Sequence, residues 1–254
     1  MTGETAAAPR FARLIPGERA HAAITADEAL SDWRSAPGPH DGVTLNMIAS
    51  VDGRIAIGGR SAPLGSPADR SLFHALRARV DAVMAGAGTV RTERYGPLIR
   101  DPHVRERRRA EGLEPQPLAV IVSRSLEIDP SVPLLADPAS RVVILTPSKG
   151  ELGACAAPIE YVRAATLRDG LRELRARWPV RRILCEGGPT LNGALAAESL
   201  VDELFLSVSP LLVGDVPGGR AVVTGGAPPV PRRLELRMLL ACESQLFPYY
   251  VVST

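Results

Sequence analysis

The chain has 254 residues, of which 45% are hydrophobic, so it can bury a large core as one big domain or two small ones. Its formal net charge of +2 is small for this length and argues against nucleic acid as the main partner. Three separated cysteines, no apolar run long enough to span a membrane, and an N-terminus without the apolar core of a signal peptide favour a cytoplasmic protein.

Residues 1–40 are rich in Ala, Pro, Gly and charge, and we interpret them as an N-terminal extension with one short helix at 26–34. From 41 to 254 we expect one domain in which strand-like and helical runs alternate. The expected strands cover 43–50, 81–88, 117–123, 141–147, 180–188 and 201–214, and a terminal hairpin covers 234–253. The expected helices cover 66–80, 167–178 and 189–200.

The helix at 66–80 has the clearest start signal, because Ser66 is a good N-cap, Pro67 a good first helical residue, and Asp69 suits the positive end of the helix dipole. The alternation predicts an α/β fold with a mixed, mostly parallel central sheet and helices on both faces. The segment 100–117 is polar and rich in arginine, so we expect a mobile insertion with a solvated face.

The stretch SVDGR, 50–54, interrupts the first expected strand with small and polar residues. An Asp-Gly pair is common in tight turns, so an ordinary turn is one explanation. A loop at the mouth of a binding site, where a ligand approaches the backbone, is the other.

Two glycine-bearing strand ends, 84–91 and 185–193, could carry chemistry. Glycine lets backbone N–H groups approach a phosphate, and a helix N-terminus favours negative charge. The alternative is a tight strand-to-helix turn that needs glycine for steric reasons alone. No histidine or cysteine cluster has metal-ligand spacing, so we expect no metal site.

Small or polar residues follow five expected strands, at Ser50, 86–89, 123–124, Thr146 and 186–188. Ligands in open α/β sheets bind outside the carboxyl ends of the strands. The presence of small or polar residues at all five strand ends favours a long phosphorylated cofactor that lies across the sheet. Ser123 and Arg124 would suit an additional phosphate, such as the 2′-phosphate of NADP, because arginine binds phosphates through a planar fork.

The motifs LNMIASVDGRIA, VDAVMAGAGTVR and RRILCEGGPTLNGALAAESLVDELFLSVSPLLVG, in this order, resemble the pyrimidine reductases of riboflavin biosynthesis, a family similar to dihydrofolate reductase in fold. The resemblance runs from Val43 to the C-terminus. It implies an NADPH-dependent homodimer that acts on a small molecule. The cofactor-binding residues that it implies are Ala49, Ser50, Asp52, Gly86, Gly88, Thr89, Val90, Ser123, Arg124, Thr146, Glu186, Gly187, Gly188, Pro189 and Thr190.

The resemblance also implies a substrate end of the site. It places Asn46 and Ser66 at the substrate, and 46–56 beside the nicotinamide. Where the family is expected to carry Asp-Asp-Pro, this chain has Glu93, Arg94 and Tyr95, which we assign to catalysis (Glu93) and substrate binding. In bacteria, a reductase of this family is usually joined to a deaminase with a His-x-Glu and Pro-Cys-x-x-Cys zinc signature. This sequence contains neither motif, so we expect no deaminase activity.

A second difference from the riboflavin reductases is the Pro-Ala-Asp run at 67–69. It resembles the helix of dihydrofolate reductase whose aspartate holds the pterin. Asp69 is therefore a candidate catalytic acid, or only a first-turn carboxylate that stabilises the helix. The leading substrate is a ribosylamino-pyrimidine of the 5-amino-6-(5-phosphoribosylamino)uracil type. The alternatives are a dihydrofolate or other pterin reductase, and a non-catalytic NADP-binding protein.

Overall fold

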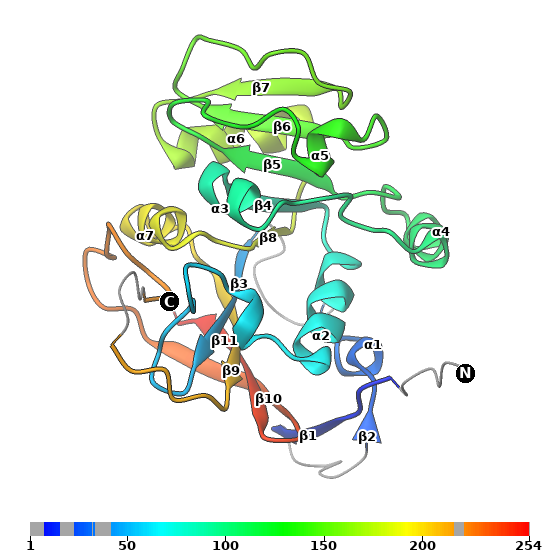
Figure 1. Cartoon of the computed structure of the whole chain (residues 1–254), viewed down its shortest axis with the longest axis vertical. Helices are drawn as coiled ribbons and strands as arrows, with labels where there is room; N and C mark the ends of the chain where they lie inside the picture. The colour runs from blue at the N-terminus through cyan, green and yellow to red at the C-terminus, as the bar shows by residue number, and fades with distance from the viewer. Residues whose placement is uncertain (1–7, 16–22, 32, 34–41, 216–220, 254) are drawn as a thin grey trace.

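The computed structural model describes residues 8–15, 23–31, 33, 42–215 and 221–253. These residues form one 11-stranded sheet with helices on both faces (Figure 1). The strands are β1 (Phe11–Ile15), β2 (Ala23–Ile24), β3 (Val43–Ser50), β4 (Ala82–Gly86), β5 (Leu118–Val122), β6 (Val142–Thr146), β7 (Ile159–Arg163), β8 (Ile183–Cys185), β9 (Glu203–Ser209), β10 (Leu234–Cys242) and β11 (Gln245–Val252). The helices are α1 (Ala26–Ala29), the 3-10 helix η2 (Ala62–Leu64), α2 (Pro67–Arg77), α3 (Ala87–Thr92), α4 (Pro102–Ala110), α5 (Pro133–Ala136), α6 (Leu167–Arg177) and α7 (Pro189–Ala197).

The sheet is mixed and mostly parallel, which confirms the predicted fold class. Its strand order is β2-β1-β10-β11-β9-β3-β8-β4-β5-β6-β7. All pairs from β9 to β7 in this order are parallel. The pairs among β2, β1, β10, β11 and β9 are antiparallel, and β10 with β11 is the predicted terminal hairpin. The parallel half therefore directs the carboxyl ends of its strands toward one side of the molecule.

Both faces of the parallel half are covered. Successive residues of a strand point to opposite faces, and in β4 Val83 belongs to one buried cluster while Met84 belongs to the other. On the first face, α2 contributes Leu72 and Leu76, which lie four residues apart on one side of the helix. On the second face, α6 and α7 supply the covering leucines, among them Leu195. This double cover explains why the central strands are nearly continuous apolar runs.

Part of the predicted N-terminal extension packs into the sheet. β1 pairs with β10, and the Phe11 ring, fully buried, meets Phe247 edge to face with ring centroids 5.3 Å apart. The helix predicted at 26–34 is shorter, because α1 ends at Ala29 and residues 32 and 34 lie outside the described part of the chain. The N-terminal segment thus contributes strands and core residues to the domain.

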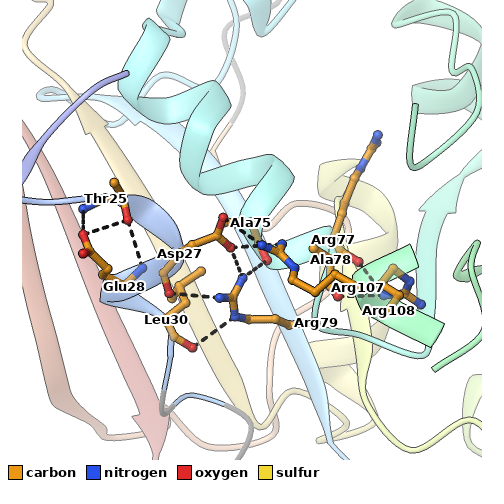
Figure 2. A network of polar contacts seen from close by, with 10 residues as sticks. All are labelled: Thr25, Asp27, Glu28, Leu30, Ala75, Arg77, Ala78, Arg79, Arg107 and Arg108. Carbon is orange, nitrogen blue, oxygen red and sulfur yellow. Dashed lines mark hydrogen bonds and ion pairs between the residues drawn. The ribbon is translucent and has the colours of Figure 1, made fainter. Parts of the chain in front are cut away.

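Arg79, just after α2, fastens α1 to that helix (Figure 2). Its guanidinium donates to the Asp27 carboxylate at 2.6 Å and to the Leu30 carbonyl at 3.2 Å. The same side chain also donates to the Ala75 carbonyl at 3.0 Å. Because the last carbonyls of a helix have no partner within it, one arginine stabilises the ends of two helices.

The sequence prediction was wrong in part for the segment 100–117. It was also wrong at 81–88, where β4 ends at Gly86 and α3 follows, and it missed β7 and α5. The segment 100–117 contains α4, and Arg108 is fully buried rather than solvated. Its guanidinium donates to the backbone carbonyls of Ala78 at 2.9 Å and Arg77 at 3.1 Å (Figure 2). It also donates to the Val80 carbonyl at 3.0 Å. The unpaired carbonyls at the end of α2 carry partial negative charge, which compensates the buried cation. The sequence alone does not indicate which arginine of the run is buried against these carbonyl groups.

We predict that Arg108→Met lowers the free energy of unfolding by about 3 kcal/mol or more, because several buried carbonyl oxygens lose their donor, at about 1–3 kcal/mol each. The matched control is Arg109→Met, since the Arg109 side chain is 56% exposed and pairs with Glu106 of the same helix. That variant should stay within about 0.5 kcal/mol of wild type. Urea denaturation measures both, and equal effects would contradict the capping role.

Candidate active site

A cleft of about 1420 Å³ opens at the carboxyl ends of the parallel strands. It exceeds the roughly 300–1,000 Å³ of an ordinary small-molecule pocket. Residues from the ends of five neighbouring strands line it, namely Asn46 to Ile48 from β3, Glu186 and Gly188 after β8, Gly86 to Thr89 after β4, Val122 to Ser125 after β5, and Leu145 and Pro147 at the end of β6. The cleft therefore runs along the sheet and has room for two ligands side by side.

Most of the predicted site residues lie in the lining of this cleft. They are Asn46, Asp69, Gly86, Gly88, Thr89, Glu93, Arg94, Tyr95, Ser123, Arg124, Glu186, Gly188, Pro189 and Thr190. The predicted residues outside the lining are Ala49, Ser50, Asp52, Ser66, Val90, Thr146 and Gly187. The sheet order thus brings together strand ends that are far apart in the chain.

The two glycine-bearing turns pack against each other. The Gly86 N–H donates to the Gly187 carbonyl at 2.8 Å, and the peptide bond between Gly187 and Gly188 is cis. A Cβ added to Gly188 would lie 2.7 Å from the Thr89 hydroxyl oxygen, which is too close for any carbon. Gly187 has a φ of +88°, a backbone conformation that favours glycine. The turn therefore needs glycine for steric reasons, whatever binds beside it.

The turn at 50–54 is held by its own hydrogen bonds. The Ser50 hydroxyl donates to Asp52 at 2.5 Å, and the Asp52 carboxylate accepts from the Gly214 N–H at 2.7 Å. These bonds, with that of Ser50 first, lower the pKa of Asp52 to about 2. Ser50 is buried, and its hydroxyl also accepts from the Arg54 N–H at 2.9 Å. The polar residues that interrupt the strand thus tie the turn to the loop after β9.

A buried ion pair belongs to the lining of the cleft. Arg77 of α2 donates to both oxygens of Glu186, each at 2.7 Å, and the two side chains are only 9% and 3% exposed. The Tyr95 hydroxyl donates to the same carboxylate at 2.6 Å. The Arg77 guanidinium also lies 4.1 Å from the Phe73 ring centroid. Three elements distant in sequence meet at Glu186.

The charges of this cluster follow from its burial. Burial disfavours the charge on Arg77, but the Glu186 carboxylate outweighs that effect and raises the pKa of Arg77. Burial, with Glu186 second, raises the pKa of Tyr95 well above its usual value, so the phenol stays a neutral donor. Burial and then Arg77 lower the pKa of His74, which favours its neutral imidazole.

Asp69 lies at the first turn of α2, and its backbone N–H donates to the Ser66 hydroxyl at 3.0 Å. Burial raises the pKa of the Asp69 carboxyl, although a hydrogen bond with Ser207 acts in the opposite direction. Ser66 itself is turned away, because its hydroxyl donates to Gln245. A carboxyl in the cleft with a raised pKa can hold a proton at higher pH than an exposed one.

The segment after α3 supplies the other polar groups at this end of the cleft. The Glu93 carboxylate accepts from both the N–H and the hydroxyl of Ser61, each at 3.0 Å. Arg94 is exposed and has a φ of +47°. Glu93 therefore fixes the turn that begins η2, while Arg94 is an exposed residue of the cleft lining.

The opposite end of the cleft is formed by β5 and β6. Ser123 is buried, and its hydroxyl accepts from the Leu126 N–H at 3.0 Å, which fixes the turn that presents the exposed Arg124. Thr146 is fully buried, and its hydroxyl accepts from the Ser148 N–H at 3.1 Å. Its neighbours Leu145 and Pro147 face the cleft in its place.

Sequence reasoning missed Phe73, His74 and Arg77, which line the cleft from α2. Asp69, Phe73 and Arg77 are spaced by four residues, so they lie on one side of the helix. That spacing was the available signal. Gly225, which also lines the cleft, lies in a loop and has no such signal.

Among the described residues, no helix combines the length and apolar character needed to cross a membrane. Within the same residues, no group of three or more His, Cys, Asp or Glu side chains could hold a metal ion.

The sheet order, the terminal hairpin and the cleft at the strand ends define an α/β domain of the dihydrofolate reductase-like type. The pyrimidine reductase-like protein of Corynebacterium diphtheriae has a similar structure, with a TM-score of 0.74 at 23% identity over 91% of this chain and 100% of that one. The deaminase and 5-amino-6-(5-phosphoribosylamino)uracil reductase of Thermotoga maritima gives a TM-score of 0.67 at 21% identity, over 89% of this chain and 60% of that one.

The family model of the RibD C-terminal domain matches residues 42–247, and this chain belongs to that family. The 2,5-diamino-6-ribosylamino-4(3H)-pyrimidinone 5′-phosphate reductase of Archaeoglobus fulgidus is 30% identical over 68% of this chain and 81% of its own length. The riboflavin biosynthesis protein RibD of Mycobacterium tuberculosis is 33% identical over 69% of this chain, which covers only 43% of that protein. The predicted relationship to the pyrimidine reductases is confirmed.

We predict that Arg77→Met lowers the free energy of unfolding by about 3–5 kcal/mol, because it leaves the Glu186 carboxylate buried without its counter-ion. The double variant Arg77→Met/Glu186→Gln should lose less than Arg77→Met alone, since the amide still accepts from Tyr95 and carries no charge. A double-mutant cycle by urea denaturation measures this coupling. Strictly additive effects of the two substitutions would show that the pair is not coupled.

Proposed function

We propose that this chain is an NADPH-dependent reductase of a ribosylamino-pyrimidine, of the 5-amino-6-(5-phosphoribosylamino)uracil type, in riboflavin biosynthesis. The observation that carries the proposal is the single cleft that joins Arg124 at one end to Asn46 and Asp69 at the other. The cleft lies at the carboxyl ends of the parallel strands, where ligands bind in α/β sheets, and it is large enough for a dinucleotide with a substrate. Family membership and the named activity of the archaeal relative support the reaction class. A reductase of this kind would work in the cytoplasm.

The cofactor would lie along the strand ends. Arg124, exposed at the end of β5, would bind the 2′-phosphate together with Ser123. Gly188 and Thr190, on the turn that begins α7, would bind the pyrophosphate through backbone N–H groups. When bound, NADPH supplies the hydride. The protein's part is to orient both ligands and exclude water between them.

If Arg124 binds the 2′-phosphate, wild type should bind NADPH more tightly than NADH. Arg124→Ala should weaken NADPH binding by one to two decades, because a charge-assisted contact is worth about 1.5–3 kcal/mol, and should leave NADH binding unchanged. The control is Arg105→Ala, on α4 and outside the cleft lining. Fluorescence titration measures each affinity, and equal curves for the two cofactors in wild type would refute the assignment.

At the substrate end, the segment 93–95 and Arg100 would bind the ribosyl phosphate and hydroxyl groups. Arg94 and Arg100 are exposed in the cleft, as a phosphate requires. Glu93 lines the cleft and accepts two hydrogen bonds from Ser61, so its carboxylate would hold this segment in place and meet the substrate hydroxyl groups. Asn46, on β3, also lines the cleft and would bind the substrate.

A pterin such as dihydrofolate is the second candidate substrate, and the carboxyl of Asp69 favours it. This group lies at the first turn of a helix, in the cleft, with a pKa raised by burial. It could hydrogen-bond a pterin ring and deliver a proton to it. In the pyrimidine reaction, we expect a substitution of Asp69 to lower the rate less than a substitution in the segment 93–95.

Asp69→Asn tests which substrate uses this acid. With dihydrofolate, the variant should lose about 10²–10⁴-fold in rate, because the amide cannot supply a proton. The wild-type rate should be highest below the raised pKa of Asp69 and should fall as the pH rises through that pKa. The rate of the variant should not show this fall. With the pyrimidine, Glu93→Gln should have the larger effect.

The measurement is NADPH oxidation by wild type, Asp69→Asn and Glu93→Gln with both substrates. Turnover of the pyrimidine alone would exclude the pterin reaction. A third class of function, a non-catalytic NADP-binding protein, predicts that NADPH binds but is consumed with neither substrate. That outcome would reject both reductase proposals while leaving the cofactor site intact.

We also propose a homodimer. β9 lies between β11 and β3, and its residues alternate between buried and half-buried. The half-buried row is Leu204, Leu206 and Val208, and Leu246 beside Val208 is 41% exposed. An apolar row of this kind on a sheet face suits a second copy of the chain.

Light scattering at micromolar concentration should therefore report about twice the chain mass of 27.0 kDa. Leu206→Glu should shift the mass toward that of the monomer, since it places a charge on the apolar row. A wild-type mass of one chain would remove the proposal.

A further inference from the structure

A short segment after β9, residues 221–226, lies on the first turns of α7, and we call it the strap. The Thr224 N–H donates to the Pro189 carbonyl at 3.0 Å. The side-chain amide of Asn192 donates to the Val222 carbonyl at 2.8 Å. In Figure 1 the orange stretch of chain that holds the strap passes beside α7. Two hydrogen bonds therefore join the strap to the helix that follows the Gly187–Gly188 turn.

The contact between strap and helix is backbone on backbone. A Cβ added to Gly193 would lie 2.1 Å from the Thr224 carbonyl oxygen, and one added to Gly226 would lie 2.5 Å from the Gly193 carbonyl oxygen. Neither position has room for a side chain. Glycine is unfavourable inside a helix, so this close approach is the physical reason for its presence in the middle of α7.

The strap also reaches the cleft. Gly225 belongs to the cleft lining, with Pro189 and Thr190 from α7. It has a φ of +74°, and its position is close to Thr190, whose methyl group would lie 3.6 Å from an added Cβ. Because α7 follows β8, which lies between β3 and β4, this part of the cleft is between the Asn46 end and the Arg124 end.

Asn192 connects the strap to the glycine turn. It is fully buried, and besides Val222 its amide nitrogen contacts the Met47 sulfur at 3.3 Å. The same nitrogen lies 3.8 Å from the Cβ position of Gly187. One side chain thus holds the strap, β3 and the turn in a fixed relation.

We propose that the strap forms the outer wall of the pyrophosphate part of the cofactor site, and that Asn192 and Gly193 are positioning residues that hold it there. This inference rests on the proposed NADPH site. It assigns to the loop after β9 a role in cofactor affinity, confined to the middle of the cleft. Contacts at the adenosine end, around Arg124, are independent of the strap.

Two probes separate the middle of the cleft from its end. NADP⁺ spans both, whereas adenosine 2′-monophosphate reaches only the Ser123–Arg124 end. The variants are Gly193→Ala, which forces the backbones apart, and Asn192→Leu, which keeps the number and branching of the side-chain heavy atoms but removes the donor to Val222. The control is Gly153→Ala, where an added Cβ would meet open space outside the cleft.

Calorimetric titration should show that both variants bind NADP⁺ at least about tenfold more weakly, with adenosine 2′-monophosphate affinity within about twofold of wild type. Circular dichroism identifies variants that fold, and Asn192→Leu serves if Gly193→Ala does not. Unchanged NADP⁺ affinity in a folded variant would overturn the proposal, as would equal loss of both probes. If wild type binds neither probe, the NADPH site itself fails and the strap's role with it.

Discussion

The Arg77–Glu186 ion pair holds together the two sides of the cleft. Arg77 belongs to the helix that also carries Asp69, and Glu186 precedes the glycine turn that begins α7. A bidentate pair fixes both distance and orientation, and Tyr95 adds a third donor to the same carboxylate. Removing either charge would leave the other buried and unpaired, so the pair constrains any substitution nearby.

The helix that carries Arg77 is itself held at its far end. Arg108 and Arg79 donate to carbonyls at or near the C-terminal end of α2, and Arg79 ties α1 to it (Figure 2). The N-terminal strands β1 and β2 continue the sheet on the side of the molecule where α1 and α2 lie (Figure 1). The substrate side of the cleft therefore depends on segments that contact no ligand, including one outside the region that the family model matches.

Local patterns predicted the elements well and the contacts between them poorly. The Ser66–Pro67 cap located α2, and the apolar runs located the parallel strands other than β7, because both signals lie within a few neighbouring residues. The elements β7, α3, α4 and α5 were not predicted. Most of the site residues that the strand ends and the family resemblance predicted also lie in the cleft lining. The Tyr95–Glu186 bond joins residues 91 positions apart, and the buried place of Arg108 depends on the end of another helix. Such contacts depend on tertiary packing, which no local period encodes.

The most direct test of the account is a crystal structure of the protein with NADP⁺ bound. We expect the 2′-phosphate at Arg124, the pyrophosphate between Gly188 and Gly225, and the nicotinamide at the end of the cleft that contains Asn46 and Asp69. The electron density of the cofactor would show each position directly. A cofactor bound outside the cleft, or with its nicotinamide at the Arg124 end, would contradict the reductase assignment.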